Sequence, residues 1–295
     1  MKRMLSVLFL AIFCLCGCGE TETQEGLSVV AVSFPGYSFA KEIVGDFGEV
    51  TMLLPLGAEA HGYEPTPKDM LKIQDCDVFI YGGGASEHWV EEVLSSTDGT
   101  MQRVAMTDCV PHLEGDHEGH DHGADEHVWT DPVNAMEIAK AIGEAVCKAD
   151  PENRGTYEKN TKDCLARLQK LNEAYADALL NTDTEIVMAD RFPFLYLAER
   201  YGLSYRAAFP GCAGESEPSA ATVAELIDYV KQNKIPVVYY TEFSNREVAD
   251  ILCETTGAKA LMLHSCHNVS VEDFQNGASY FSLMEQNLEH LKEAR

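Results

Sequence analysis

Residues 151–182 read PENRGTYEKNTKDCLARLQKLNEAYADALLNT, and this stretch decides the fold. Pro151 can begin a helix, and no further proline interrupts the segment. The apolar side chains recur at three- and four-residue spacing, as they do on one face of an α-helix. They are Tyr157, Cys164, Leu168, Leu171, Tyr175 and Leu179. A helix from about Glu152 to Leu180 would be roughly 40 Å long at 1.5 Å per residue. The stretch therefore predicts one rigid helix that can lie along two lobes.

Short apolar and β-branched runs lie on both sides of this helix, separated by helix-compatible or Gly- and Pro-rich stretches. They occupy residues 27–33, 49–55, 76–82 and 102–108 before it, and 184–190, 203–210, 235–243 and 259–264 after it. This alternation is typical of βαβ units. We therefore predict an α/β fold with two lobes, each with a roughly four-stranded, mainly parallel sheet flanked by helices. The expected divisions are an N-terminal lobe at 27–150, the linking helix at 151–182 and a C-terminal lobe at 183–295.

The N-terminus has the pattern of an exported protein. Two basic residues precede an apolar run at 4–15 that is too short to span a bilayer, so residues 1–17 are expected to be a signal peptide rather than an uncleaved anchor helix. The run ends on LCGC, which resembles the bacterial lipobox and indicates acylation of Cys18. The polar residues 18–26 would then form a tether. We expect an extracytoplasmic protein that is lipid-anchored to the outer face of the cytoplasmic membrane.

The formal net charge of −26 argues against nucleic acid and anionic lipid surfaces as partners, because both require a basic surface. Such a charge is also typical of a solvated surface, so it indicates a cationic ligand only weakly. Of the ten cysteines, two would leave with the signal peptide and Cys18 would be acylated, so seven remain. Because seven is odd, at least one of them is unpaired or ligates a metal.

Three histidines fall where predicted strands end or a helix begins. His61 follows the run at 49–55 within GAEAHGYEPTP, His127 opens HVWTDP before a helix, and His264 ends the run at 259–264. Parallel sheets bind ligands beyond the carboxyl ends of their strands, so we expect these imidazoles to converge between the lobes. Asp190, at the end of its own run, would add one carboxylate. A set of three imidazoles and one carboxylate is suited to four-coordinate zinc.

The segment HLEGDHEGHDHGADEH at 112–127 is enriched in histidine. Acidic residues and glycines separate the imidazoles, so the segment cannot bury a core and is expected to be a mobile loop that binds metal weakly. It would collect zinc or sense its abundance; a solvated loop or a cloned tag is the alternative. Besides His127, its candidate auxiliary ligands are His112, His117, His120 and His122.

Several motifs in order resemble the zinc and manganese solute-binding proteins of ABC importers. They are GAEAHGYEPTPKDM, the histidine-rich insert followed by HVWTDP, FLYLAERYGL, ESEPSAATVAELI and SLMEQNLEHL. The resemblance implies a monomeric binding protein, not an enzyme, that captures an ion between its lobes and delivers it to a permease with an ATPase partner. The insert resembles the loop of zinc-selective members, so Zn²⁺ is preferred to Mn²⁺.

The same resemblance carries ligand roles onto particular positions. His61 and His127 match the two first-lobe ligands. The position of the third ligand is occupied by Arg191, whose guanidinium cannot bind a cation, which leaves the neighbouring Asp190. The last ligand of the family is an aspartate at the end of the final strand, and here that position is His264. Other possible fourth ligands are Glu217, His267 and water.

Two cysteines, Cys212 and Cys266, are expected in loops near the mouth of the second lobe. They could form a disulfide, which suits an exported protein, or supply a thiolate ligand. A bridge between Cys147 and Cys164 is a second candidate.

Two other functions compete with metal capture for an importer. A metal-storage or adhesin lipoprotein would act through the histidine-rich loop, with an inert cleft. A zinc hydrolase would use three protein ligands and an activated water, although the chain has no HExxH pair to support that chemistry.

Overall fold

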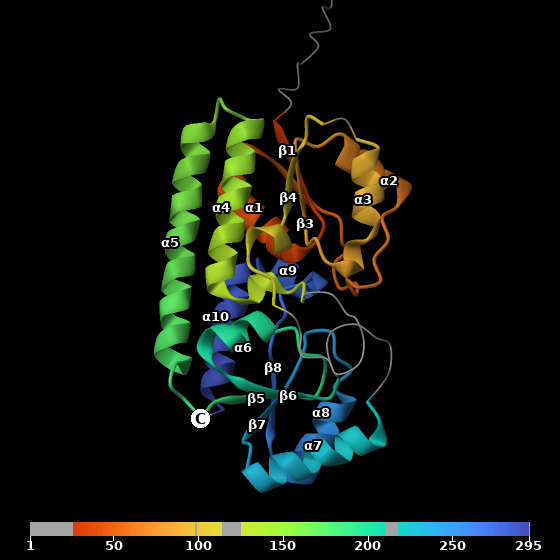
Figure 1. Ribbon diagram of the computed structural model, residues 1–295, viewed down its shortest axis with the longest axis vertical. Helices are drawn as coiled ribbons and strands as arrows, with labels where there is room; N and C mark the ends of the chain where they lie inside the picture. The colour runs from red at the N-terminus through yellow and green to blue at the C-terminus, as the bar shows by residue number, and fades with distance from the viewer. Residues whose placement is uncertain (1–25, 98, 114–124, 210–217, 295) are drawn as a thin grey trace, which may run out of the picture.

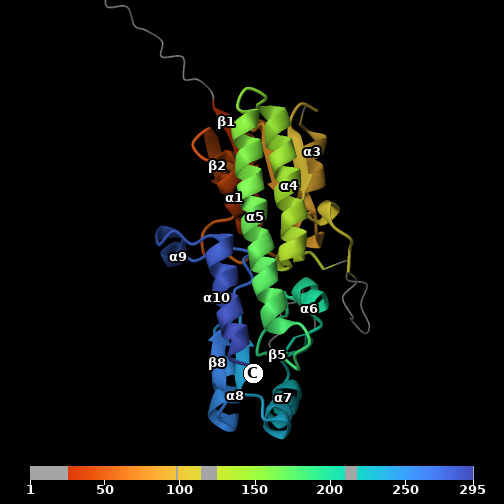
Figure 2. The same ribbon diagram turned by 90° about the vertical axis from the view of Figure 1, so that its left-hand side faces the viewer.

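The long helix α5 (Arg154–Leu179) runs beside both lobes in the computed structural model, which describes residues 26–97, 99–113, 125–209 and 218–294. All six apolar positions predicted for one face of this helix are buried. Figure 2 shows α5 beside α4 (Pro132–Ala149) along the first lobe and beside α10 (Tyr280–Lys292) at the second. The predicted linking helix is therefore confirmed, and it contributes to the core of both lobes.

The N-terminal sheet contains four parallel strands in the order β2-β1-β3-β4. Alternate residues of β1 face opposite sides, so Val29 packs toward α1, α4 and α5, whereas Val30 packs toward α2 and α3. Figure 1 shows these two helical layers on either side of the sheet. The elements of the lobe before α4 are β1 (Leu27–Ala31), α1 (Phe34–Val44), β2 (Gly48–Met52), α2 (Pro67–Gln74), β3 (Val78–Tyr81), η1 (Ala85–Glu87), α3 (Trp89–Ser95), β4 (Gln102–Ala105), η2 (Thr107–Cys109) and η3 (Val128–Thr130).

The C-terminal sheet repeats this plan with four parallel strands in the order β6-β5-β7-β8. Val187 and Val238 face α7 and α8, while Ile186 and Tyr239 face the core shared with α5, α6 and α10. The elements are β5 (Glu185–Met188), α6 (Leu195–Tyr201), β6 (Ser204–Ala207), α7 (Ala220–Asn233), β7 (Val237–Tyr240), α8 (Glu247–Thr256), β8 (Lys259–Met262) and α9 (Val271–Gln275), followed by α10. The predicted α/β class with two parallel sheets is confirmed.

The loops at the carboxyl ends of the two sheets contact each other directly. The Trp129 indole N–H donates to the Ser265 carbonyl at 2.9 Å, and the Tyr280 hydroxyl donates to the Trp129 carbonyl at 2.7 Å. The Phe34 N–H, just after β1, donates to the His267 carbonyl at 3.1 Å. These bonds fix the second-lobe loop after β8 against the first lobe, so the edges that carry the candidate ligands face each other.

No helix among the described residues is both long enough and sufficiently apolar to cross a membrane. The expected signal peptide, Cys18 and the tether at 18–26 lie outside the described residues, apart from the last residue of the tether.

Candidate metal centre

Three imidazoles meet where the two lobes face each other. His61 lies in the loop after β2, His127 immediately precedes η3, and His267 lies in the loop after β8. One ring nitrogen from each lies within 4.8 Å of the other two, and it is the one such cluster of potential ligands found in the described part of the chain. His127 and His267 are buried, and His61 is half-buried. The arrangement is suited to a metal ion that binds imidazole nitrogens, such as zinc.

Carboxylates orient two of these rings. Glu59 Oε1 lies 2.7 Å from His61 Nδ1, and Asp125 Oδ1 lies 3.1 Å from His127 Nδ1. The hydrogen bond to His61 lowers the pKa of Glu59 to about 2, so this carboxylate is ionised and can only accept. Burial opposes ionisation of Asp125, but the charge and hydrogen bonds of His127 outweigh it and lower the pKa. In the neutral form of each ring, a contact of this kind places the proton on Nδ1 and makes Nε2 the atom that can ligate a metal.

His267 is held in the neutral form that binds metals. Burial, followed by the charges of His127 and His61, lowers its pKa to about 3. The indole of Trp129 packs against the His267 ring with centroids 4.9 Å apart. Because only a neutral imidazole can ligate, His267 needs no deprotonation at neutral pH.

The loop after β8 is held in place by Glu242, which follows β7. The Ser265 N–H donates to Glu242 Oε2 at 2.9 Å, and the Ser265 hydroxyl donates to Oε1 at 2.5 Å. Cys266 then adopts a left-handed backbone with φ of 60°, which turns the chain so that His267 faces the first lobe. Glu242 thus helps to position a candidate ligand without lying among the three imidazoles.

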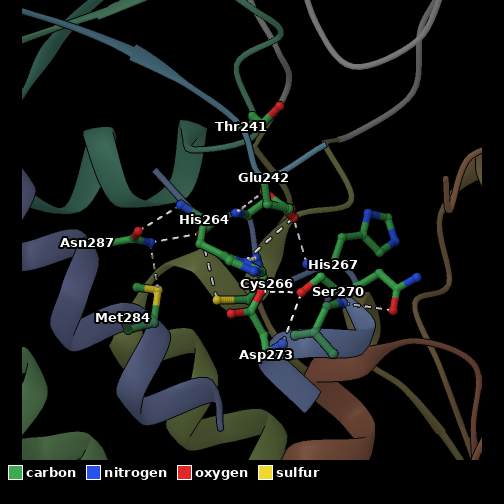
Figure 3. A network of polar contacts seen from close by, with 12 residues as sticks. Thr241, Glu242, His264, Cys266, His267, Ser270, Asp273, Met284 and Asn287 are labelled. Carbon is green, nitrogen blue, oxygen red and sulfur yellow. Dashed lines mark hydrogen bonds and ion pairs between the residues drawn. The ribbon is translucent and has the colours of Figure 1, made fainter. Parts of the chain in front are cut away.

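His264 does not lie where we expected it. His267 instead occupies the position between the lobes that we predicted for His264. The His264 N–H donates to Asn287 Oδ1 at 2.7 Å, and Asn287 Nδ2 donates back to the His264 carbonyl at 2.8 Å. The ring accepts from the Cys266 N–H through Nδ1 at 3.0 Å. Figure 3 shows His264 beside Asn287, while the His267 ring points away from both. These bonds to α10 and to its own loop hold His264 in the second-lobe interior, outside the imidazole cluster.

Asp190 lies in the same cavity as the cluster but is not part of it. The cavity has a volume of about 500 Å³, and Asp190 and Arg191 line it together with the three imidazoles. One Asp190 oxygen accepts from the Arg191 N–H at 2.8 Å, and the other accepts from the Thr241 hydroxyl at 2.7 Å. Both oxygens are thus already engaged, and ligation by Asp190 stays a prediction.

The remaining predicted residues are only partly described. His112 is exposed, and His117, His120, His122, Cys212 and Glu217 lie outside the described residues. Cys266 is a free, fully buried thiol within the shared core, which differs from the expected bridge to Cys212. Its left-handed backbone points Sγ inward, 3.7 Å from the His264 carbonyl. Cys147 and Cys164 are also free thiols.

Sequence reasoning missed Glu126, which precedes His127 in the chain. Its Oε1 lies 3.3 Å from His61 Nε2. Burial opposes ionisation, but the close contact with His61 and the charge of His127 outweigh it and lower the pKa of Glu126 to about 2. The pattern ADEH, in which two acids immediately precede a candidate ligand, was a signal that could have directed attention to it.

The two parallel α/β lobes, the linking helix and the histidine cluster between the sheet edges define a two-lobed solute-binding protein with a metal site. A family model described as the periplasmic component A of the zinc-uptake complex, ZnuA, matches residues 29–294. The chain belongs to this family, and the resemblance that its motifs indicated is confirmed.

Curated relatives share about a third of their residues with the chain. The high-affinity zinc uptake system protein ZnuA of Bacillus subtilis is 35% identical over 315 residues, which cover 100% of this chain and 98% of the relative. The zinc-binding lipoprotein AdcA of Streptococcus pneumoniae is 36% identical over 97% of this chain, and the match spans 60% of AdcA.

Solved structures of similar proteins share the fold of this chain. The metal-dependent lipoprotein YcdH of B. subtilis superposes with a TM-score of 0.80 at 36% identity, covering 91% of this chain and 99% of YcdH. The Zn(II)-bound ZnuA-like domain of S. pneumoniae AdcA gives 0.79 at 35% identity, covering 91% and 98%.

Proposed function

We propose that this protein captures a zinc ion between its lobes and delivers it to the permease of an ABC importer driven by a partner ATPase. The observation that carries the proposal is the convergence of His61, His127 and His267 from both lobes. Two of these imidazoles present Nε2 because carboxylates hold their Nδ1 atoms. Membership in a zinc-uptake family supports the same role.

Zinc is the metal that this ligand set favours. Imidazole nitrogens suit zinc, whereas manganese prefers carboxylate, carbonyl and water oxygens. The relatives named for zinc, and the zinc-bound AdcA domain, support the choice. Manganese is therefore expected to bind more weakly at this site.

An extracytoplasmic location belongs to the same proposal. The family is described as periplasmic, and a relative is named a lipoprotein. The signal-like N-terminus and the lipobox-like sequence ending at Cys18 support a lipid anchor on the outer face of the cytoplasmic membrane. We propose that the anchored protein acts as a monomer beside its permease.

Calorimetric titration with zinc tests the proposal. We expect one tight site that disappears in His61→Ala, because the substitution removes one of three imidazole ligands. The site should survive deletion of residues 114–124, since the three imidazoles lie outside that segment. His88→Ala is the matched control, because His88 is an exposed histidine of the same lobe. Tight binding that is lost only with the deleted segment would instead indicate storage by the histidine-rich loop.

A further inference from the structure

Glu126 directs a carboxylate at the imidazole cluster. Its Oε1 lies 3.3 Å from His61 Nε2, and its side chain is 13% exposed. Nε2 of His61 is buried and has no hydrogen-bond partner, so the short approach lacks hydrogen-bond geometry. Burial opposes protonation of His61, but the contacts with Glu126 and Glu59 outweigh it and raise the pKa. In the neutral ring that a metal requires, Nδ1 donates to Glu59, so Nε2 carries a lone pair and two acceptors face each other. A cation between them would satisfy both.

The distance between these two atoms matches a zinc shell. Nitrogen and oxygen ligands lie about 2.0–2.1 Å from zinc, so two of them in a tetrahedral shell are roughly 3.3 Å apart. The 3.3 Å between Glu126 Oε1 and His61 Nε2 is that separation. The pair is therefore spaced as two corners of a tetrahedron with room for the ion between them.

Contacts within the first lobe hold the Glu126 side chain in a defined position. Its other oxygen, Oε2, accepts from the Ser86 hydroxyl at 2.7 Å, within η1 after β3. Gly84 provides the space, because a Cβ at this position would lie 1.9 Å from Glu126 Oε2. Ser86 and Gly84 thus fix one carboxylate oxygen and leave the other directed toward His61.

Three carboxylates that line the cavity are engaged elsewhere. Glu59 binds the Nδ1 side of His61, and both oxygens of Asp190 accept hydrogen bonds from Arg191 and Thr241. Both oxygens of Glu242 accept from Ser265. Glu126, beside this cavity, instead directs one oxygen at His61 Nε2.

We propose that Glu126 is the fourth ligand of the captured ion and binds it through Oε1. This inference rests on the proposed function and makes it more specific. The shell then consists of three imidazoles and one carboxylate. His61, Glu126 and His127 come from the first lobe, so His267 is the sole ligand from the second lobe.

Glu126→Gln tests this assignment, because it removes the charge at nearly constant shape. We expect zinc affinity, measured by competition with a chromogenic chelator, to fall by more than about 100-fold, which is the upper end of the loss typical of a supporting contact. Cobalt(II) bound in place of zinc should also change its visible absorption, since one ligand of the tetrahedral shell changes. Glu64→Gln, at an exposed glutamate of the same lobe, should leave both readouts unchanged.

The outcomes separate this inference from the proposed function. Wild-type binding that is tight and lost in His61→Ala, together with Glu126→Gln binding equal to wild type, would overturn the fourth ligand and leave zinc capture intact. Lost affinity with an unchanged cobalt spectrum would also overturn ligation and make Glu126 a positioning residue. If wild-type protein binds no zinc tightly, the proposed function itself fails. Circular dichroism confirms that the Glu126→Gln protein is folded.

Discussion

At the scale of single residues, Glu87 is a carboxyl buried beneath the metal centre. Its Oε2 accepts hydrogen bonds from the Gly82 N–H at 2.6 Å and the Gly83 N–H at 3.1 Å. Burial raises its pKa from an ordinary value of 4.5 to about 7, and the charge of Glu126 adds to this, although the two N–H groups favour ionisation. Folding therefore favours the protonated form of Glu87.

The stability of the metal-free protein should consequently depend on pH through this group. Below the pKa that Glu87 has in the unfolded chain, the carboxyl is protonated in both the folded and the unfolded state. As the pH rises from there through the folded-state pKa of about 7, the free energy of unfolding falls, because ionisation costs more in the native state. Relative to wild type, Glu87→Gln should gain on the order of 3 kcal/mol in free energy of unfolding between about pH 4 and pH 8. Urea unfolding in chelator measures this difference. Glu91→Gln, at an exposed site, should track wild type; a Glu87→Gln difference that is constant with pH would contradict the prediction.

Single residues also show where prediction of the site from the sequence stops. His61 and His127 were found because short proline-containing loops tie each of them to a predictable strand end or helix start. His267 was named only as an alternative, because its placement depends on the left-handed turn at Cys266 and on bonds to Glu242 and Asn287. These partners lie far away in the sequence, so the pattern HSCH cannot indicate which histidine faces the cavity.

At the scale of elements, α5 was predicted well because its apolar face follows helical spacing, and local spacing is visible in the sequence. The predicted start of this helix, near Glu152, is slightly earlier than its observed start at Arg154. Residues 151–153 instead form a bend in which Asp150 Oδ2 accepts from Asn153 Nδ2 and from the Tyr157 hydroxyl, both at 2.7 Å. The strands were likewise correct in position but shorter than the apolar runs, because the run ends form loops.

The buried face of α5 should make a large contribution to stability. Leu168 is fully buried in the core shared by the two lobes, so Leu168→Ala leaves a cavity and should lower the free energy of unfolding by about 2–5 kcal/mol. Lys170→Ala, two residues along on the exposed face, should change it by less than about 0.5 kcal/mol. Chemical denaturation measures both. Similar small effects for the two variants would show that α5 is not a structural part of the core.

At the scale of the whole molecule, one apolar core connects the lobes. It contains Val29 and Ile80 of the first sheet, Leu168 of α5, and Ile186 and Tyr239 of the second sheet. The sequence predicted two lobes and the helix that joins them. It could not predict this continuity or the bonds between the facing loops, because both depend on how the lobes dock. A continuous core favours a single cooperative unfolding transition.

Zinc should therefore stabilise the entire protein rather than one lobe. An ion that binds only the native state at 1,000 times its Kd adds about 4.1 kcal/mol to the free energy of unfolding. We expect calorimetry to show one thermal transition that moves to higher temperature with zinc and returns with chelator. His61→Ala should lose this shift, and His88→Ala should keep it. Two transitions, only one of which responds to zinc, would mean that the lobes unfold independently and that the shared core does not couple them.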